Sequence, residues 1–324
     1  MQAAQFYRTF DGVCVSSIGL GSYLGNPDDA TDLAYRDAVT AAVRGGANVI
    51  DTAINYRNQR SERSIGGALE ELFRAGDCRR DEIVVSTKAG FLTPGAVPAF
   101  LETEHVVGAM HSMDPDFLTD QMNRSLANLG LASIDVFYLH NPETQLAHVP
   151  REEFDRRIRA AFARLERIAG EGKIEYYGTA TWDGYRRPKG ARNALSLTRL
   201  LEIAQEEGGA QHRFRFIQLP VNLAMTEALA NGVLDEARAA NIAVMASASL
   251  LQARLARDLP EALVEKLPGL NTDAQRAIQF TRSTPGVTIA LVGMSNPVHV
   301  AENLQVGALA PLPEHEYREL YQRA

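Results

Sequence analysis

The chain has 324 residues, of which 45% are hydrophobic and 23% charged, and its formal net charge is −7. This composition is that of an ordinary soluble globule and excludes a disordered or fibrous chain. The mild acidic charge is spread along the sequence, so we expect neither a nucleic-acid partner nor an anionic membrane surface.

The two cysteines and the N-terminal segment indicate the cellular setting. Cys14 and Cys78 lie far apart and match neither a metal-binding spacing nor a disulfide framework. Residues 1–6 lack the charged and apolar regions of a signal peptide, and no apolar run reaches the ~20 residues that a membrane span needs. We therefore expect a reduced, cytoplasmic protein without a structural metal, and a monomer as the default because no coiled-coil pattern is present.

Short apolar runs alternate with longer amphipathic segments along the chain. The predicted strands cover residues 18–21, 48–51, 82–87, 134–139, 174–178, 214–219, 242–246 and 288–292. The predicted helices after them cover residues 33–44, 61–75, 117–129, 152–169, 194–207, 228–240 and 273–284, with an eighth beginning near Pro297. Eight strand-then-helix units in strict order predict an α/β fold, a single (β/α)₈ TIM barrel over residues 1–324.

Three segments depart from this repeat. The turn dipeptide Asp11-Gly12 predicts a short N-terminal hairpin that caps the closed end of the barrel. Long loops follow the third strand (residues 90–115) and the seventh (residues 247–270), on the face where barrel enzymes keep their sites. For the first loop we predict a substrate lid, with an ordinary surface loop as the alternative; its pocket-lining residues would be Phe91, Phe100, His105, His111 and Met113.

Four polar residues lie at the ends of predicted strands or just after them: Asp51, Tyr56, Lys88 and His140. Each alone would more often be a capping, packing or solvated residue. Together at one end of a barrel, the carboxylate would hold the ammonium, and the ammonium would lower the pKa of the phenol from ~10 towards working pH. Such a phenol protonates a carbonyl oxygen while another group delivers hydride. The group predicts a reductase.

Several sequence blocks accompany these four residues in a fixed order. They are Gly19-Leu20-Gly21-Ser22, residues 48–56 from Asn48 to Tyr56, Ser86-Thr87-Lys88, and residues 125–140 ending in Tyr138-Leu139-His140. With them the sequence resembles the aldo-keto reductase superfamily over almost its whole length. The resemblance implies a barrel that binds a nicotinamide dinucleotide without a Gly-x-Gly-x-x-Gly fingerprint. It also implies Tyr56 as general acid, Lys88 and Asp51 as the pair that tunes it, and His140 as the donor that orients the substrate carbonyl.

The same resemblance implies a set of cofactor-binding residues, namely Gly21, Ser22, Thr181, Gln218, Ser247, Leu250, Gly293, Ser295, His299, Glu302 and Asn303. Ala180 and Ser247 stand where the family has a serine and an aromatic ring against the nicotinamide, so Trp182 or Tyr23 is a candidate substitute ring. Ser295 and His299 stand where lysine or arginine usually meets the 2′-phosphate. A phosphate favours fixed positive charge, so we expect NADP (NADPH) with weakened discrimination against NAD.

The predicted function is therefore a nicotinamide-dependent oxidoreductase that interconverts a small aldehyde or ketone and its alcohol, with Tyr56 as general acid and base. Two alternatives stay open. One is an NAD-linked sugar or alcohol dehydrogenase. The other is a non-catalytic nicotinamide-binding regulatory subunit, because some members of the superfamily act as channel subunits. The physiological substrate depends on loops whose shape the sequence does not give.

Overall fold

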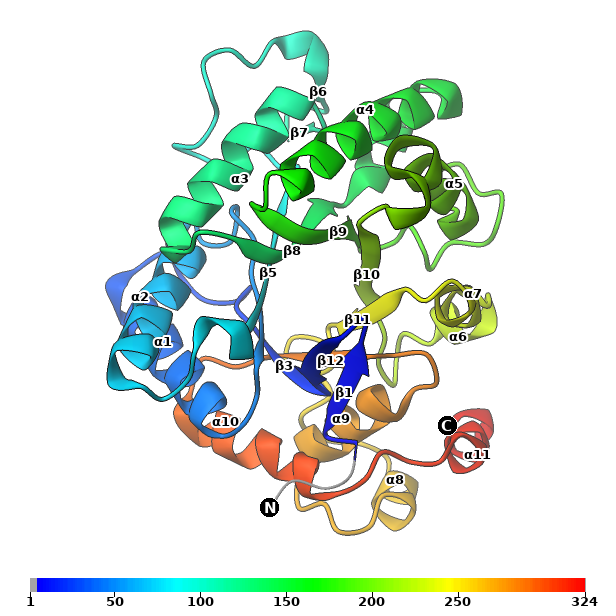
Figure 1. Cartoon of the computed structure of the whole chain (residues 1–324). Helices are drawn as coiled ribbons and strands as arrows, with labels where there is room; N and C mark the ends of the chain where they lie inside the picture. The colour runs from blue at the N-terminus through cyan, green and yellow to red at the C-terminus, as the bar shows by residue number, and fades with distance from the viewer. Residues whose placement is uncertain (1–4, 324) are drawn as a thin grey trace.

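The computed structural model describes residues 5–323 (Figure 1). Residues 1–4, which include part of the segment examined for a signal peptide, and residue 324 lie outside the described residues. Eight parallel strands form the centre: β3 (Ile18–Gly21), β4 (Val49–Asp51), β5 (Val84–Ala89), β8 (Ile134–His140), β9 (Ile174–Ala180), β10 (Phe214–Pro220), β11 (Ala243–Ser247) and β12 (Ile289–Gly293). They close into a barrel in the order β10-β11-β12-β3-β4-β5-β8-β9, which confirms the predicted (β/α)₈ fold.

Helices surround this barrel on its outer face (Figure 1). Several begin at a side-chain cap, such as Asp28, whose carboxylate accepts from the backbone amide of Thr31. The helices are α1 (Asp29–Arg44), α2 (Arg60–Ala75), α3 (Pro115–Leu129), α4 (Arg151–Gly170), α5 (Leu197–Gly208), α6 (Glu227–Ala230), α7 (Val233–Ala239), α8 (Glu261–Lys266), α9 (Asp273–Ser283), α10 (Pro297–Leu304) and α11 (Glu314–Arg323).

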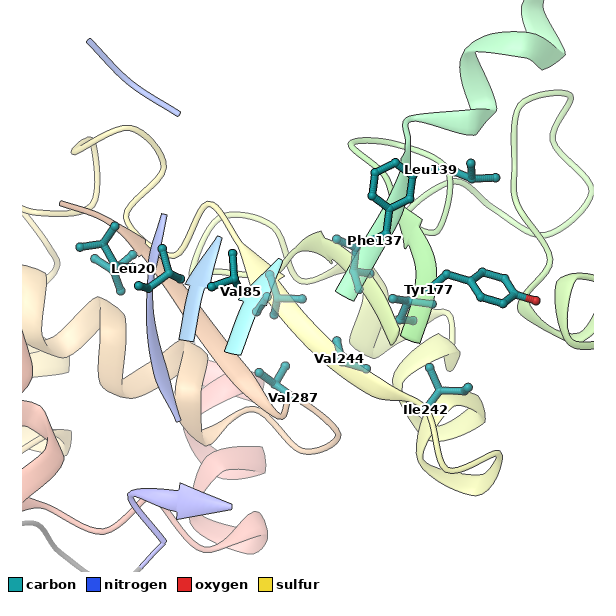
Figure 2. Packing of buried hydrophobic residues seen from close by; sticks show 14 of the residues in the cluster. Leu20, Val85, Phe137, Leu139, Tyr177, Ile242, Val244 and Val287 are labelled. Carbon is teal, nitrogen blue, oxygen red and sulfur yellow. The ribbon is translucent and has the colours of Figure 1, made fainter. Parts of the chain in front are cut away.

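Both faces of the barrel strands are buried, which is why the strands read as continuous apolar runs. Leu20, Val85 and Phe137 belong to the larger core cluster, which also includes helix residues, and each is fully buried (Figure 2). A second cluster contains other residues of the barrel strands, such as Val49 and Phe216. The barrel is therefore a filled core, and a barrel enzyme of this kind binds its ligand beyond the carboxyl ends of the strands.

The N-terminal hairpin closes one end of the barrel, as predicted. Strands β1 (Tyr7–Phe10) and β2 (Val13–Ser16) pair antiparallel. Asp11 and Gly12 have φ values of 48° and 81°, the left-handed pair that a two-residue hairpin turn needs. The ring of Phe10 meets the ring of Phe216 with centroids 5.2 Å apart.

Two local predictions were wrong, and two local elements were not predicted. The predicted helix 228–240 is two short helices, because Gly232 takes a left-handed φ of 81° between α6 and α7. The predicted loop 247–270 contains α8, and α11 was not predicted, although Tyr317 and Leu320 on it are buried. The loop after β5 contains a small antiparallel hairpin, β6 (Val106–Val107) and β7 (His111–Ser112).

Among residues 5–323, no helix has both the length and the apolar character to cross a membrane.

Candidate active site

The strand register brings the predicted catalytic residues to one rim of the barrel. Asp51 ends β4 and lies opposite Ser86 of β5. Lys88 lies two residues further along β5, and His140 ends the neighbouring strand β8. Because the strands are parallel, these side chains share the carboxyl end of the barrel.

Lys88 and Asp51 form a buried ion pair at this rim. The Nζ atom of Lys88 lies 2.6 Å from Oδ2 of Asp51 and donates to the carbonyl oxygen of Thr52 at 2.7 Å. The other carboxylate oxygen of Asp51 accepts from Ser86 Oγ at 2.7 Å and from Gln218 Nε2 at 2.8 Å. Both oxygens are thus satisfied, and the position of the ammonium is fixed.

Tyr56 is the next partner of this ion pair. Its phenolic oxygen lies 3.4 Å from Lys88 Nζ. Burial raises the pKa of Tyr56 well above its usual value, and the charge of Asp51 adds to this effect. The expectation that Lys88 brings the phenol to working pH was therefore wrong for this site. Loss of hydration penalises the phenolate, and Lys88 is already paired with Asp51. The phenol is protonated at neutral pH.

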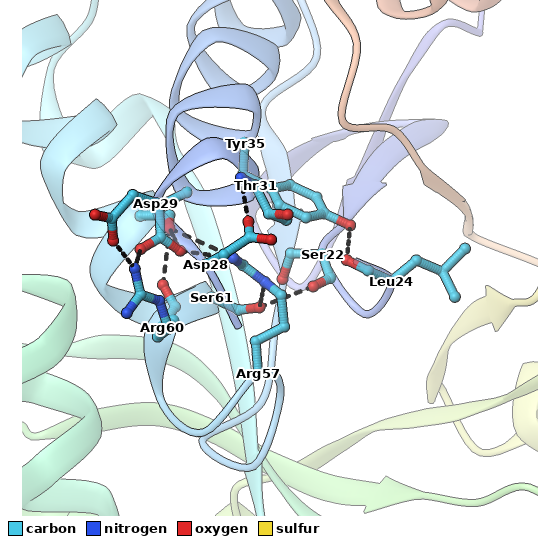
Figure 3. Close-up of polar contacts among 11 residues, drawn as sticks. Ser22, Leu24, Asp28, Asp29, Thr31, Tyr35, Arg57, Arg60 and Ser61 are labelled. Atoms are coloured by element: carbon cyan, nitrogen blue, oxygen red, sulfur yellow. Dashed lines mark hydrogen bonds and ion pairs between the residues drawn. The ribbon is translucent and has the colours of Figure 1, made fainter. Parts of the chain in front are cut away.

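An unusual turn directly after Tyr56 holds the phenol in place. Residues 57–59 have consecutive positive φ values of 49°, 54° and 71°. The buried guanidinium of Arg57 donates to Ser61 Oγ of α2 at 3.0 Å (Figure 3). It also donates to Asp32 Oδ1 of α1 at 2.6 Å, so the turn is tied to both helices. The sequence did not point to Arg57, because only the folded chain brings Asp32 and Ser61 to it.

The loop after β3 is anchored to the same two helices. Ser61 Oγ donates to the carbonyl oxygen of Ser22 at 2.9 Å, and the hydroxyl of Tyr35 donates to the carbonyl oxygen of Leu24 at 2.8 Å (Figure 3). Tyr23, between these anchors, packs edge-on against Tyr56 with ring centroids 5.0 Å apart. The anchors therefore set one wall of the site.

His140 also packs against Tyr56. The two ring centroids are 5.9 Å apart. Burial lowers the pKa of His140 well below its usual value, with smaller contributions from Lys88 and His111, so the imidazole is neutral. Its Nδ1 atom is buried without a hydrogen-bond partner, which leaves Nε2 as the nitrogen open to the cavity.

A cavity of about 510 Å³ opens between these walls. Lys88 is fully buried and does not line it. Tyr23, Phe91 and Trp182 supply aromatic rings, and Asn55 and Asn141 supply carboxamides that the sequence did not single out. The predicted residues that line the cavity are Gly21, Ser22, Asp51, Tyr56, His140, Thr181, Gln218, Ser247, Leu250 and Gly293.

The predicted lid was mostly wrong. Only Phe91 of its five residues lines the cavity. Phe100 is 55% exposed, Met113 is buried in the core, and His105 pairs with Asp114 at 2.9 Å. His111 is fully buried and bonded to the backbone of His140. Periodicity could not separate these cases, because the loop folds back through its own β6–β7 hairpin.

The remaining predicted cofactor residues lie on or just before α10, outside the cavity lining. Ser295 and His299 are exposed. Glu302 accepts a hydrogen bond from Thr272 at 2.8 Å, and Asn303 is buried. Within the described segment 293–304 there is no lysine or arginine.

Unpaired polar atoms in the cavity wall show what the site can bind. Thr181 Oγ1 and Ser249 Oγ are buried without a partner. Gln218 has committed its amide nitrogen to Asp51 and keeps its carbonyl oxygen. These groups suit a ligand that offers an amide or hydroxyl function. Among the described residues 5–323, no group of three or more His, Cys, Asp or Glu side chains is arranged to hold a metal ion.

Comparison with known proteins agrees with this geometry. The sequence model of the aldo/keto reductase family matches residues 17–323. The chain belongs to the aldo/keto reductase family.

Two curated relatives in this family differ in role. A probable voltage-gated potassium channel subunit beta of Arabidopsis thaliana is 27% identical over 323 residues, covering 93% of this chain and 90% of the relative. A D-threo-aldose 1-dehydrogenase of Pseudomonas sp is 28% identical over 325 residues, covering 92% of this chain and 91% of the relative.

Solved aldo/keto reductases share the fold. The Klebsiella pneumoniae enzyme in complex with NADP and acetate has a TM-score of 0.69 at 21% identity, covering 96% of this chain and 92% of that chain. The thermostable aldo-keto reductase Tm1743, solved with the inhibitor epalrestat, has a TM-score of 0.70 at 19% identity, covering 98% and 99%.

Proposed function

We propose that the protein is a nicotinamide dinucleotide-dependent oxidoreductase that interconverts a small aldehyde or ketone and its alcohol. One observation carries the proposal: the Tyr56 hydroxyl lies 3.4 Å from the buried ammonium of Lys88, and Tyr56 lines a cavity of about 510 Å³. An acid that faces a cavity and contacts a fixed cation is equipped to transfer a proton to a bound substrate.

Tyr56 is the general acid in the direction of reduction. Because burial keeps the pKa of Tyr56 high, the phenol carries its proton at neutral pH and gives it to the carbonyl oxygen. Lys88 stabilises the phenolate that remains, and Asp51 fixes Lys88. The neutral imidazole of His140 directs its Nε2–H at the same oxygen, where negative charge develops.

The dinucleotide, NADP(H) in the first instance, supplies or accepts the hydride when bound. NADP and NADPH occupy structures of the Klebsiella pneumoniae relative. In this chain the unpaired Thr181 Oγ1 and the free carbonyl oxygen of Gln218 would hold the carboxamide of the nicotinamide. Ser22, Ser247, Leu250 and Gly293 line the same cavity and would contact the rest of the dinucleotide.

A second candidate is an NAD-linked sugar or alcohol dehydrogenase that runs the same chemistry towards oxidation. The absence of lysine and arginine from the described segment 293–304 favours it, because a 2′-phosphate would find no fixed cation there. The 28% identity to a D-threo-aldose 1-dehydrogenase supports the same class of substrate.

The test is to mix pure protein with NADPH or NADH and a panel of aromatic aldehydes and sugars, and with NADP or NAD and the matching alcohols. We expect the near-ultraviolet absorbance of the reduced cofactor to fall or rise with at least one substrate. A flat trace across the whole panel, together with tight cofactor binding, would contradict the proposal and favour a regulatory subunit.

A further inference from the structure

His111 is a buried titratable group beside the site that the proposed chemistry does not use. It lies on β7, in the segment that leaves the barrel after β5, and it is fully buried. Its Nε2 lies 2.7 Å from the backbone carbonyl oxygen of His140. A carbonyl oxygen only accepts, so the proton of His111 is on Nε2.

A chain of polar contacts fixes this tautomer from the other side. Gln145 Nε2 lies 2.9 Å from His111 Nδ1, and Arg157 donates to Gln145 Oε1 at 2.7 Å. Because Arg157 can only donate, Gln145 must present its amide N–H to His111. Nδ1 is therefore an acceptor, and burial lowers the pKa of His111 to about 4, which keeps the ring neutral.

The bonded carbonyl belongs to the point where β8 ends and the chain turns. Asn141 takes a left-handed φ of 50° directly after His140, and its backbone N–H donates to the carbonyl oxygen of Ala180 at 2.6 Å. Gly90 leaves room for the contact, since a Cβ on it would lie 2.7 Å from His111 Nε2 and 2.8 Å from the His140 oxygen. The backbone is thus shaped around the hydrogen bond from His111.

Among residues 5–323, the imidazole of His140 has no hydrogen-bond partner of its own to set its direction. Its Nδ1 is buried without a partner. The ring of Phe91 meets His140 edge-on at 5.1 Å and His111 edge-on at 5.2 Å, so it packs between the two imidazoles. The ring of His140 is held by its own peptide and by Phe91, and His111 contacts both.

We propose that His111 is a positioning residue, which fixes the peptide and ring of His140 so that Nε2 of His140 faces the substrate oxygen. The proposal rests on the proposed function in assigning His140 a role with substrate. It does not rest on that function for the contact itself. A shift of about 1 Å in such a donor can cost about 100-fold in rate.

The test compares His111→Gln with His111→Asn. The glutamine amide reaches the place of Nε2 and keeps a donor to the His140 carbonyl, whereas the shorter asparagine does not reach it. We expect kcat of His111→Asn to fall by about 10-fold to 100-fold with KM for the cofactor within about twofold, and kcat of His111→Gln to stay within about threefold of the parent. His148→Asn, which changes an exposed histidine, is the matched control.

A second readout needs no turnover. In ¹⁵N-labelled, cofactor-free protein, the ring signals of His140 should shift in His111→Asn and keep their positions in His111→Gln and His148→Asn. Should His111→Asn not fold, Gln145→Met takes its place, because it frees the His111 ring. Equal kcat and equal His140 signals in His111→Asn and His111→Gln would overturn the positioning role of His111. A parent protein that shows the expected spectra but no turnover would overturn only the proposed function.

Discussion

The two ends of the site differ in how firmly side-chain contacts hold their residues. At the proton-transfer end, which comprises Asp51, Tyr56, Lys88 and His140, Asp51 alone accepts from three side chains, and Tyr56 is followed by a turn that a buried arginine anchors. At the α10 end, Ser295 and His299 are exposed and no fixed cation is present between residues 293 and 304. A proton donor has to be placed closely against its acceptor, whereas a 2′-phosphate is bound mainly through charge-assisted hydrogen bonds. Substitutions should therefore change rate at the first end and cofactor preference at the second.

The largest effect should follow from Lys88→Met. The variant leaves Asp51 without its cation and Tyr56 without the charge that stabilises its phenolate, so kcat should fall by about 10²-fold to 10³-fold. Cofactor affinity, measured by fluorescence titration, should change by less than about threefold. Lys189→Met, at an exposed lysine, is the control. A parallel loss of cofactor binding would break the contrast between the two ends.

The pH dependence of stability should reveal the buried His111, which contacts the backbone of His140 at the proton-transfer end. The pKa of His111 is about 4 when folded, against ~6.5 unfolded, so the folded state binds fewer protons between these values. The contribution of neutral His111 to the free energy of unfolding is complete above pH ~6.5 and is lost as the pH falls towards 4. The loss is on the order of 3 kcal/mol for this shift. The free energy of unfolding, measured with urea between pH 7 and pH 4, should therefore fall less steeply with pH in His111→Gln than in the parent protein. Identical slopes would contradict a neutral, buried His111.

Arg57→Met should weaken the turn that holds Tyr56. The guanidinium side chain is 2% exposed, and Asp32, which is 26% exposed, keeps its ion pair with Arg60. Loss of the hydrogen bonds of Arg57 should therefore cost about 1–3 kcal/mol in the free energy of unfolding. Displacement of the phenol should lower kcat by about 10-fold. Arg74→Met, on the exposed face of α2, controls for the loss of an arginine. Stability lost with kcat unchanged would show that the turn does not set the position of Tyr56.

The smallest effect is expected at the α10 end. Ser295→Lys combined with His299→Arg should raise the ratio of kcat/KM for NADPH over NADH by roughly 10-fold, because a fixed cation favours the 2′-phosphate. The change in kcat with saturating cofactor should be small. Ala301→Lys, at another exposed position of α10, separates a local contact from a general charge effect. An unchanged ratio would place the phosphate elsewhere.

The sequence predicted the barrel well because each strand is a compact apolar run followed by an amphipathic helix. The convergence of Asp51, Lys88 and His140 followed from the same periodicity, since parallel strands end at one rim. The sequence alone could not show the contacts between segments that lie far apart in the chain. Arg57 meets Asp32, and His111 meets His140, only after the loops have folded. The pKa of Tyr56 was mispredicted for a related reason, because burial depends on the whole fold.

The most direct test of the account is a single-turnover comparison of the parent protein and Tyr56→Phe with bound reduced cofactor and an active aldehyde. Cofactor binding is first measured by fluorescence, and cofactor oxidation is then followed by stopped-flow absorbance. The account predicts cofactor dissociation constants within about twofold, and a hydride-transfer rate that is lower in Tyr56→Phe by about 10²-fold to 10⁴-fold. Equal rates in the two proteins, or equal loss of binding and rate, would contradict Tyr56 as the proton donor.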